Sequence, residues 1–473
     1  MDEFSDINQP WLEQIFGSFN ASRLDMRLFG RSPESFHPDS ATVAAMATYV
    51  HEHMHYFQTL FTGFGHILWS SHRQSSGYSV RKWKELARTG LGYRFPFAAY
   101  SDDPAGGQVA WVVDNTARDV SRISAARFNL PIPNCTFREL KTRLITTDWV
   151  INPVVEIAGE KVCLQGKDIL EGQAHFVERT LVEALTSSGD IAWDRKGVPA
   201  QYTRAFDYFI ERCGLTRSAE FPVICDLAQQ TSWVPALPAT EDDWRKSSPS
   251  WRFVQITDLI AADCNLSFGG PADWPSRFIY LASDIFKRLG YLSPEKVIEE
   301  RLSAFTRVPE LLDVEQVMKA AMEFRSERPW MAANPAADLT WLEELLEKFR
   351  APSVVIDGAF VKFGEAPVNG SQIVFELHFQ ALANQLIGPI KIDDDGNGVL
   401  QCGFGQFKVD RGCPYQISHN CSTHFRPSGE PPVPTARLDN DEVDGCSFAF
   451  GLQSITGDLK KIQLVPGARF PAI

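Results

Sequence analysis

Several signals that would place this chain in a membrane or outside the cell are missing from its sequence. No apolar run approaches the roughly 20 residues that a helix needs to cross a bilayer. Residues 1–6 are acidic and lack the basic segment and the apolar stretch of a secretory signal. The nine cysteines are an odd number without a dense framework, which is typical of reduced thiols. We therefore expect a cytoplasmic protein with no membrane partner.

The sequence also lacks an excess of positive charge and several motifs of nucleotide and hydrolase chemistry. Lysine and arginine number 46 against 59 aspartates and glutamates, a net charge of −13, whereas phosphate binding favours a basic surface. No Gly-x-x-x-x-Gly-Lys-Ser/Thr loop, no Gly-x-Ser-x-Gly elbow and no complete Gly-x-Gly-x-x-Gly occurs. We expect no nucleic-acid partner. A cysteine nucleophile stays open, because no local signature selects one thiol.

Histidine is scarce, with 10 residues in the chain, but three of them fall in the run His51-Glu52-His53-Met54-His55. This run contains the pattern His-Glu-x-x-His. Two imidazoles four positions apart lie about 40° from each other on a helix and one turn apart, so both can bind one cation. The carboxylate between them can take a proton from a water molecule that the cation activates. The pattern predicts His51 and His55 as metal ligands and Glu52 as a general base.

The residues around this run are typical of a helix over about 40–62. Asp39 or Ser40 can serve as its N-cap, and Gly63 with Gly65 can end it.

One apolar stripe along this expected helix orients the motif. The two ligand histidines lie roughly 80–120° from the centre of the stripe, and Glu52 lies about 180° from it, facing out of the core. His53 falls on the opposite flank and is not expected to be a ligand. A surface helix that happens to be rich in histidine is the alternative. The stripe consists of Val43, Ala47, Val50, Met54, Phe57 and Phe61.

A second expected helix, which begins at Asp168 as its N-cap, can supply the third ligand that a catalytic zinc site needs. Glu171, His175 and Glu178 share one face, roughly 80–140° from the apolar stripe of that helix. The motif histidines have the same offset, so packing the two stripes together lets both polar faces line one cleft. The stripe consists of Leu170, Ala174, Val177, Leu181 and Ala184.

His-Glu-x-x-His followed by Glu-Gly-x-Ala-x-x-x-Glu resembles the gluzincin metallopeptidases, particularly the aminopeptidase N type. The resemblance implies Zn²⁺ bound by His51, His55 and Glu171, with Glu52 as general base. Glu178 matches the second acidic residue of the downstream motif. The resemblance covers two short segments and implies a zincin-like core.

The chain departs from that family in its spacing and its specificity motif. Glu171 follows His55 by 116 positions (171 − 55), far beyond the family's usual short spacing. No Gly-x-Met-Glu-Asn segment occurs, so we expect an endopeptidase and not an amino-terminal exopeptidase. His175 stands where the thermolysin-like branch carries an aspartate.

Two residues of the second helix and two tyrosines have open roles. His175 can hydrogen-bond to a metal ligand and orient it without binding the metal, or act as an extra ligand. It can also donate a proton to the oxyanion as a catalytic residue, or be an ordinary histidine at a helix interface. Glu178 can accept the free N–H of a ligand histidine or be a surface glutamate. Tyr202 and Tyr208 are further candidates for an oxyanion donor.

We expect an α+β fold with a mainly helical zincin-like core, a small β-sheet and a mostly β C-terminal domain. A hairpin is expected over 149–165 and helices over 273–289, 293–305, 314–326 and 337–350. The composition changes at Ala351-Pro352, and one further helix is expected over 372–386. The predicted domains are 1–200 for the catalytic region, 201–352 for helices completing the core, and 353–473 for an accessory β domain.

The C-terminal part carries two apparent metal signals. Residues 393–398 imitate the start of a calcium loop, but Phe404 stands where the closing glutamate belongs, so a polar hairpin turn is expected. A cysteine and histidine cluster could hold a second zinc, with buried free thiols as the leading alternative. The cluster consists of Cys402, Cys413, His419, Cys421, His424 and Cys446.

The sequence therefore predicts a zinc-dependent metallopeptidase with a protein or peptide substrate. Two alternatives stay open: a non-catalytic, metal-stabilised binding or scaffold protein, and a zinc hydrolase acting on a non-peptide bond.

Overall fold

The computed structural model describes residues 16–20, 24–29, 43–95, 100, 152–186, 198–231, 240–306 and 313–350, together with short segments between 353 and 464. The chain forms two compact units. Unit 1 comprises Met1–Ala21, Leu28–Ser70 and Arg122–Ala351, and unit 2 comprises Ser22–Arg27, Ser71–Ser121 and Pro352–Ile473.

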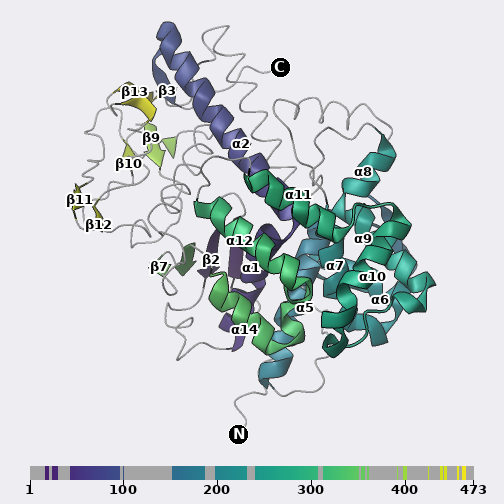
Figure 1. Ribbon diagram of the computed structural model, residues 1–473. Helices are drawn as coiled ribbons and strands as arrows, with labels where there is room; N and C mark the ends of the chain where they lie inside the picture. The colour runs from purple at the N-terminus through teal and green to yellow at the C-terminus, as the bar shows by residue number, and fades with distance from the viewer. Residues whose placement is uncertain are drawn as a thin grey trace. The chain divides into compact units, whose positions relative to one another are not determined.

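Unit 1 is mainly helical in its described residues (Figure 1). The four helices expected over 273–350 are confirmed as α10, α11, α12 and α14. Among the described residues, no helix is both long and apolar enough to span a bilayer. The helices of unit 1 are α1 (Val43–Phe61), α5 (Gly166–Thr186), α6 (Arg204–Cys213), α7 (Phe221–Gln229), α8 (Glu241–Ser247), α9 (Pro249–Ala262), α10 (Trp274–Leu289), α11 (Pro294–Thr306), α12 (Asp313–Glu327), α13 (Pro329–Ala333) and α14 (Leu339–Lys348), and α2 (Gly63–Leu86) begins in unit 1 and continues in unit 2.

Short 3₁₀ and π turns connect these helices. They are η3 (Ala87–Leu91), η6 (Ala200–Tyr202), η7 (Leu215–Glu220), η8 (Cys264–Leu266), η9 (Pro271–Asp273) and η10 (Pro335–Ala337).

The apolar stripe expected on α1 is buried. Val50, Met54, Phe57 and Phe61 are each at most 3% exposed. The ring of Phe61 lies 5.0 Å from that of Phe349, edge to face. Because aromatic side chains bury large areas, this stripe fixes α1 firmly in the core.

Glycines at the junction of α1 and α2 permit close backbone packing. α1 ends at Phe61, as expected, but α2 begins at once at Gly63. A methyl group added at Gly63 would overlap the carbonyl oxygen of Thr231, and one added at Gly65 would overlap the carbonyl oxygen of Gln58. Neither glycine has a positive φ. They are therefore needed for space and not, as expected, to end the helix in a left-handed turn.

The start of α5 lies three residues before the expected position. α5 begins at Gly166, so Asp168 lies in its first turn and is not the N-cap. The Asp168 carboxylate accepts a hydrogen bond from the Gln165 amide at 2.7 Å. A third-position side chain that satisfies the N-cap amide is half of a capping box, which explains why an acidic residue marks this helix start.

The expected hairpin before α5 is confirmed over a shorter range. β4 (Val154–Ile157) pairs antiparallel with β5 (Glu160–Cys163). Ala158 and Gly159 link them with φ values of 52° and 81°, as a two-residue type I′ turn requires. The hairpin leads directly into α5. Two further strands, β1 (Phe16–Asn20) and β2 (Asp25–Phe29), precede α1.

Unit 2 carries short strands in its described residues. β6 (Ser353–Ile356) pairs with β7 (Ala359–Val361), and β11 (Arg437–Asp439) pairs with β12 (Glu442–Asp444). β13 (Ile462–Leu464) runs parallel to β3 (Tyr93–Phe95).

β9 (Gly398–Gln401) pairs antiparallel with both β8 (Lys391–Ile392) and β10 (His424–Phe425). The pairing of β8 with β9 confirms the strands of the expected polar hairpin. The expected helix over 372–386 lies outside the described residues.

Candidate metal centre

α1 and α5 pack together and bring the three expected ligands to one point. Oε2 of Glu171 lies 3.4 Å from Nε2 of His51 and 3.3 Å from Nε2 of His55. Glu171 lies 116 positions after His55 and 120 positions after His51 in the sequence. Their convergence on a single carboxylate oxygen gives a compact group of two imidazole nitrogens and one oxygen.

The second ring nitrogen of His51 faces another carboxylate from α5. Nδ1 of His51 donates to Oε2 of Glu178 at 3.0 Å. Since a carboxylate can only accept, Nδ1 carries a proton, and when the ring is neutral Nε2 keeps its lone pair toward Glu171. Glu178 thus takes the orienting role, one of its two expected readings, and it is 6% exposed.

His175 contacts Glu178, the residue that also receives His51. Its Nδ1 lies 3.2 Å from the same Oε2 that receives His51. His51, His175 and Glu178 together form a second compact group of possible ligands. Of the roles expected for His175, this position corresponds to a partner behind the ligands.

His55 is held by an amide that the sequence argument missed. Its Nδ1 lies 2.9 Å from Oε1 of Gln58, one turn further along α1. Nε2 of Gln58 donates to the carbonyl of Leu170 and to Oε1 of Gln173, both at 3.0 Å. A signal for both glutamines existed: each lies about 60° from the centre of the apolar stripe of its helix, at the edge of the core, where a polar residue needs a buried partner.

The carboxylates around this group favour positive charge on or between the two imidazoles. When both rings are neutral with the proton on Nδ1, the facing atoms of His51, His55 and Glu171 are all acceptors, and a cation can bind between them. Burial lowers the pKa of each histidine, but the neighbouring carboxylates outweigh it and raise the pKa of both. Burial would raise the pKa of Glu171, yet the two imidazoles hold it well below its ordinary value.

The arrangement fits a zinc ion. Zinc binds imidazole nitrogen and carboxylate oxygen tetrahedrally with bonds of about 2.0–2.1 Å, which places neighbouring ligand atoms about 3.3–3.4 Å apart. The two nitrogen–oxygen separations are 3.4 and 3.3 Å. Side chains of His55 and Glu171 are each 16% exposed, so the group is open to solvent on one side.

Glu52 does not face outward as expected. It is 5% exposed, because strand β1 lies against it: a methyl group added at Gly17 would overlap Cγ of Glu52 and lie 2.7 Å from Cδ. Burial raises the pKa of Glu52, partly offset by the charges of His51 and His55. Glu52 lies on the side of α1 away from the apolar stripe, as its helical position predicts, but strand β1 covers that side.

Of the two tyrosines considered as oxyanion donors, Tyr202 lies beside the histidines and Tyr208 is bound to another residue. The Tyr202 ring lies 5.6 Å from the rings of both His51 and His175, and burial, aided by the charge of Glu171, raises its pKa to about 12. Tyr208 donates its hydroxyl to Asp258 at 2.7 Å, which occupies it in another contact.

His53 points to the opposite side of α1, where its Nε2 donates to the carbonyl of Phe349 at 3.0 Å. Apart from the strand position of His424, the C-terminal cysteine and histidine cluster lies outside the described residues.

Comparisons with protein-family models, with curated proteins and with solved structures find no match to this chain.

Proposed function

We propose that this protein is a zinc-dependent metallopeptidase that cleaves within peptide chains. The observation that carries the proposal is the convergence of three acceptor atoms, from His51, His55 and Glu171, at separations that suit one tetrahedral ion. The peptide bond as substrate rests on the resemblance of both motifs to gluzincins. The identity of the metal rests on the ligand types.

The buried carboxylate of Glu52 suits proton transfer. When bound, zinc supplies Lewis-acid polarisation of a carbonyl and lowers the pKa of water. Glu52 accepts one proton from the attacking water, whose oxygen forms a bond to the carbonyl carbon. As the carbon–nitrogen bond breaks, Glu52 returns that proton to the leaving amine. Its raised pKa brings it closer to the operating pH of a general base.

Two further side chains support the ligands and border the reacting group. Glu178 holds His51 in the tautomer that leaves Nε2 free. Tyr202 presents its ring beside His51, and a hydroxyl with a raised pKa stays protonated and able to donate to a developing oxyanion.

Two variants test this function. Purified parent protein should contain about one zinc per chain, and Glu171→Ala should lose it, because two ligands remain of the three that a catalytic site needs. Glu52→Gln should keep zinc and the fold but lose turnover of a casein or peptide-library substrate. Zinc retained at full occupancy in Glu171→Ala, or full turnover in Glu52→Gln, would remove that residue from its assigned role.

A metal-stabilised scaffold is a second candidate, favoured by the burial of His51 and Glu52 at 7% and 5% exposure. A structural ion is enclosed and its loss unfolds the domain, whereas a catalytic ion is removable with the fold intact. Circular dichroism before and after treatment with a chelator separates the two: retained helicity and restored activity on adding zinc support the hydrolase.

A further inference from the structure

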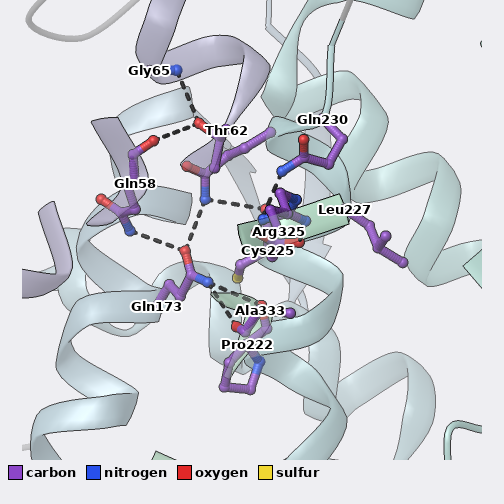
Figure 2. A network of polar contacts seen from close by, with 12 residues as sticks. Gln58, Thr62, Gly65, Gln173, Pro222, Cys225, Leu227, Gln230, Arg325 and Ala333 are labelled. Atoms are coloured by element: carbon purple, nitrogen blue, oxygen red, sulfur yellow. Dashed lines mark hydrogen bonds and ion pairs between the residues drawn. The ribbon is translucent and has the colours of Figure 1, made fainter. Parts of the chain in front are cut away.

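The orientation of Gln173 is fixed by two backbone carbonyls. Its Nε2 donates to the carbonyl oxygens of Pro222 and Ala333, both at 3.1 Å. Carbonyl oxygens only accept, so the amide nitrogen must face them, and Oε1 must face the opposite way. Gln173 is 1% exposed, and no exchange of its two amide atoms preserves these bonds (Figure 2).

This orientation dictates that of Gln58. Oε1 of Gln173 accepts from Nε2 of Gln58 at 3.0 Å, and the second hydrogen of that nitrogen goes to the Leu170 carbonyl. Turning the Gln58 amide over would set its oxygen against two other oxygens at 3.0 Å. Figure 2 shows the Gln58 and Gln173 amides meeting in this way, between α1 and α5.

This series of hydrogen bonds ends at the ring of His55, a proposed metal ligand. With both hydrogens of Gln58 used, its Oε1 is the atom that faces Nδ1 of His55 at 2.9 Å. An amide oxygen has no proton to give, so Nδ1 must carry one. A neutral His55 ring then keeps its lone pair on Nε2, the atom 3.3 Å from Glu171. The backbone carbonyls behind Gln173 thereby select the tautomer at the metal site.

We propose that Gln173 is a positioning residue that keeps the His55 ring in its metal-binding tautomer through Gln58. This inference rests on the zinc site proposed above and deepens it. Glu178 performs the same task for His51 with a charge; for His55 the protein uses two neutral amides, locked by α7 and α13. Gln173 touches no ligand directly, so it acts only through the direction of one amide.

The test compares three variants by two readouts. Gln173→Met removes the acceptor of Gln58, and Gln173→Glu keeps an acceptor facing Gln58. Gln229→Met is the matched control, because Gln229 also donates to Oε1 of Gln173, at 2.8 Å, but lies outside the path to His55. The readouts are zinc affinity by chelator competition and the ¹⁵N shifts of the His55 ring in zinc-free protein at alkaline pH.

Gln173→Met should bind zinc about ten-fold more weakly and should show partial loss of the proton on Nδ1. Gln173→Glu and Gln229→Met should keep that proton and stay within about two- to three-fold of the parent affinity. The proposal is overturned if folded Gln173→Met keeps a fully protonated Nδ1 and parental affinity, or if Gln229→Met weakens zinc as much.

Folding failure and failure of the proposed function are both distinguishable from failure of the inference. If Gln173→Met does not fold, Gln173→Ala, which also removes the acceptor of Gln58, decides: partial loss of the proton on Nδ1 supports the inference and full retention of it overturns the inference. If the parent binds no zinc, the metallopeptidase proposal fails, while the ¹⁵N shifts still report whether Gln173 selects the tautomer.

Discussion

Replacing Glu178 with glutamine removes the charge that orients His51 while preserving the size of the side chain. In the parent, one carboxylate oxygen receives Nδ1 of His51 at 3.0 Å and Nδ1 of His175 at 3.2 Å. Burial on its own would raise the pKa of Glu178, but these imidazoles lower it to about 2. The carboxylate is therefore charged throughout the neutral range, and the charge is lost in the variant.

The size of the effect follows from the hydrogen bond to His51. A charge-assisted bond contributes about 1.5–3 kcal/mol and is roughly twice as strong as a neutral one. The Glu178 side chain is 8% exposed, so solvent screens little of this. Replacing the charged acceptor by an amide oxygen should cost about 1.4 kcal/mol, which corresponds to about ten-fold weaker zinc binding.

Competition with a fluorescent chelator measures this difference, and thermal unfolding of the zinc-free proteins checks that both are folded. Glu183→Gln on the same helix is the matched control, because Glu183 is half-buried and takes no part in the ligand group; its zinc affinity should stay within about two-fold of the parent. Equal zinc affinity in Glu178→Gln and the parent would refute the argument that Glu178 orients His51.

Three further predictions concern stability. Arg325→Met should lower the free energy of unfolding in urea by about 3–5 kcal/mol, because it leaves Asp226 charged and without its ion-pair partner at a site where both side chains are 1% exposed. Adding Asp226→Leu to this variant should recover much of the lost free energy. If the double variant recovers nothing, the ion pair is not the cause of the loss. Burial lowers the pKa of His66 to about 3, from an ordinary value of 6.5, so the unfolded chain takes up the proton first. The contribution of neutral His66 to the free energy of unfolding is therefore fully present above about pH 6.5 and falls by about 1.4 kcal/mol per pH unit toward pH 3. Urea titrations at several pH values should show a flatter pH dependence of this free energy in His66→Gln. An unchanged slope would show that His66 is not the titrating group. Gly63→Ala should destabilise by about 1–3 kcal/mol or more, because the methyl group meets a backbone carbonyl, whereas Gly270→Ala, which meets open space, should change the melting temperature little.

The convergence of His51, His55 and Glu171 could be predicted from the sequence because helical periodicity is a local property. His51 and His55 lie one turn apart whatever surrounds them, and the stripe of α5 fixes the face on which Glu171 and Glu178 lie. The same reasoning placed α10, α11, α12 and α14 within a few residues.

The features of the site that the sequence did not predict depend on contacts between distant segments. No period in the sequence shows that Gly17 lies on Glu52, because β1 and α1 meet only in three dimensions. Gln58 and Gln173 border apolar stripes, which signals a buried polar contact but does not show which partner each one finds. The glycines at 63 and 65 have a similar ambiguity: a helix end and a close backbone approach favour the same residue.

The imidazole of His51 spans two carboxylates of one helix. Nε2 faces Glu171 and Nδ1 faces Glu178, and these acids stand two helical turns apart, about 10.5 Å along the axis. The contacts of this one ring therefore depend on the axial register between α1 and α5. If α5 slid along its axis by one turn, about 5.4 Å, both acids would leave the ring together, so release of an ion and slippage of the helix pair would be one event.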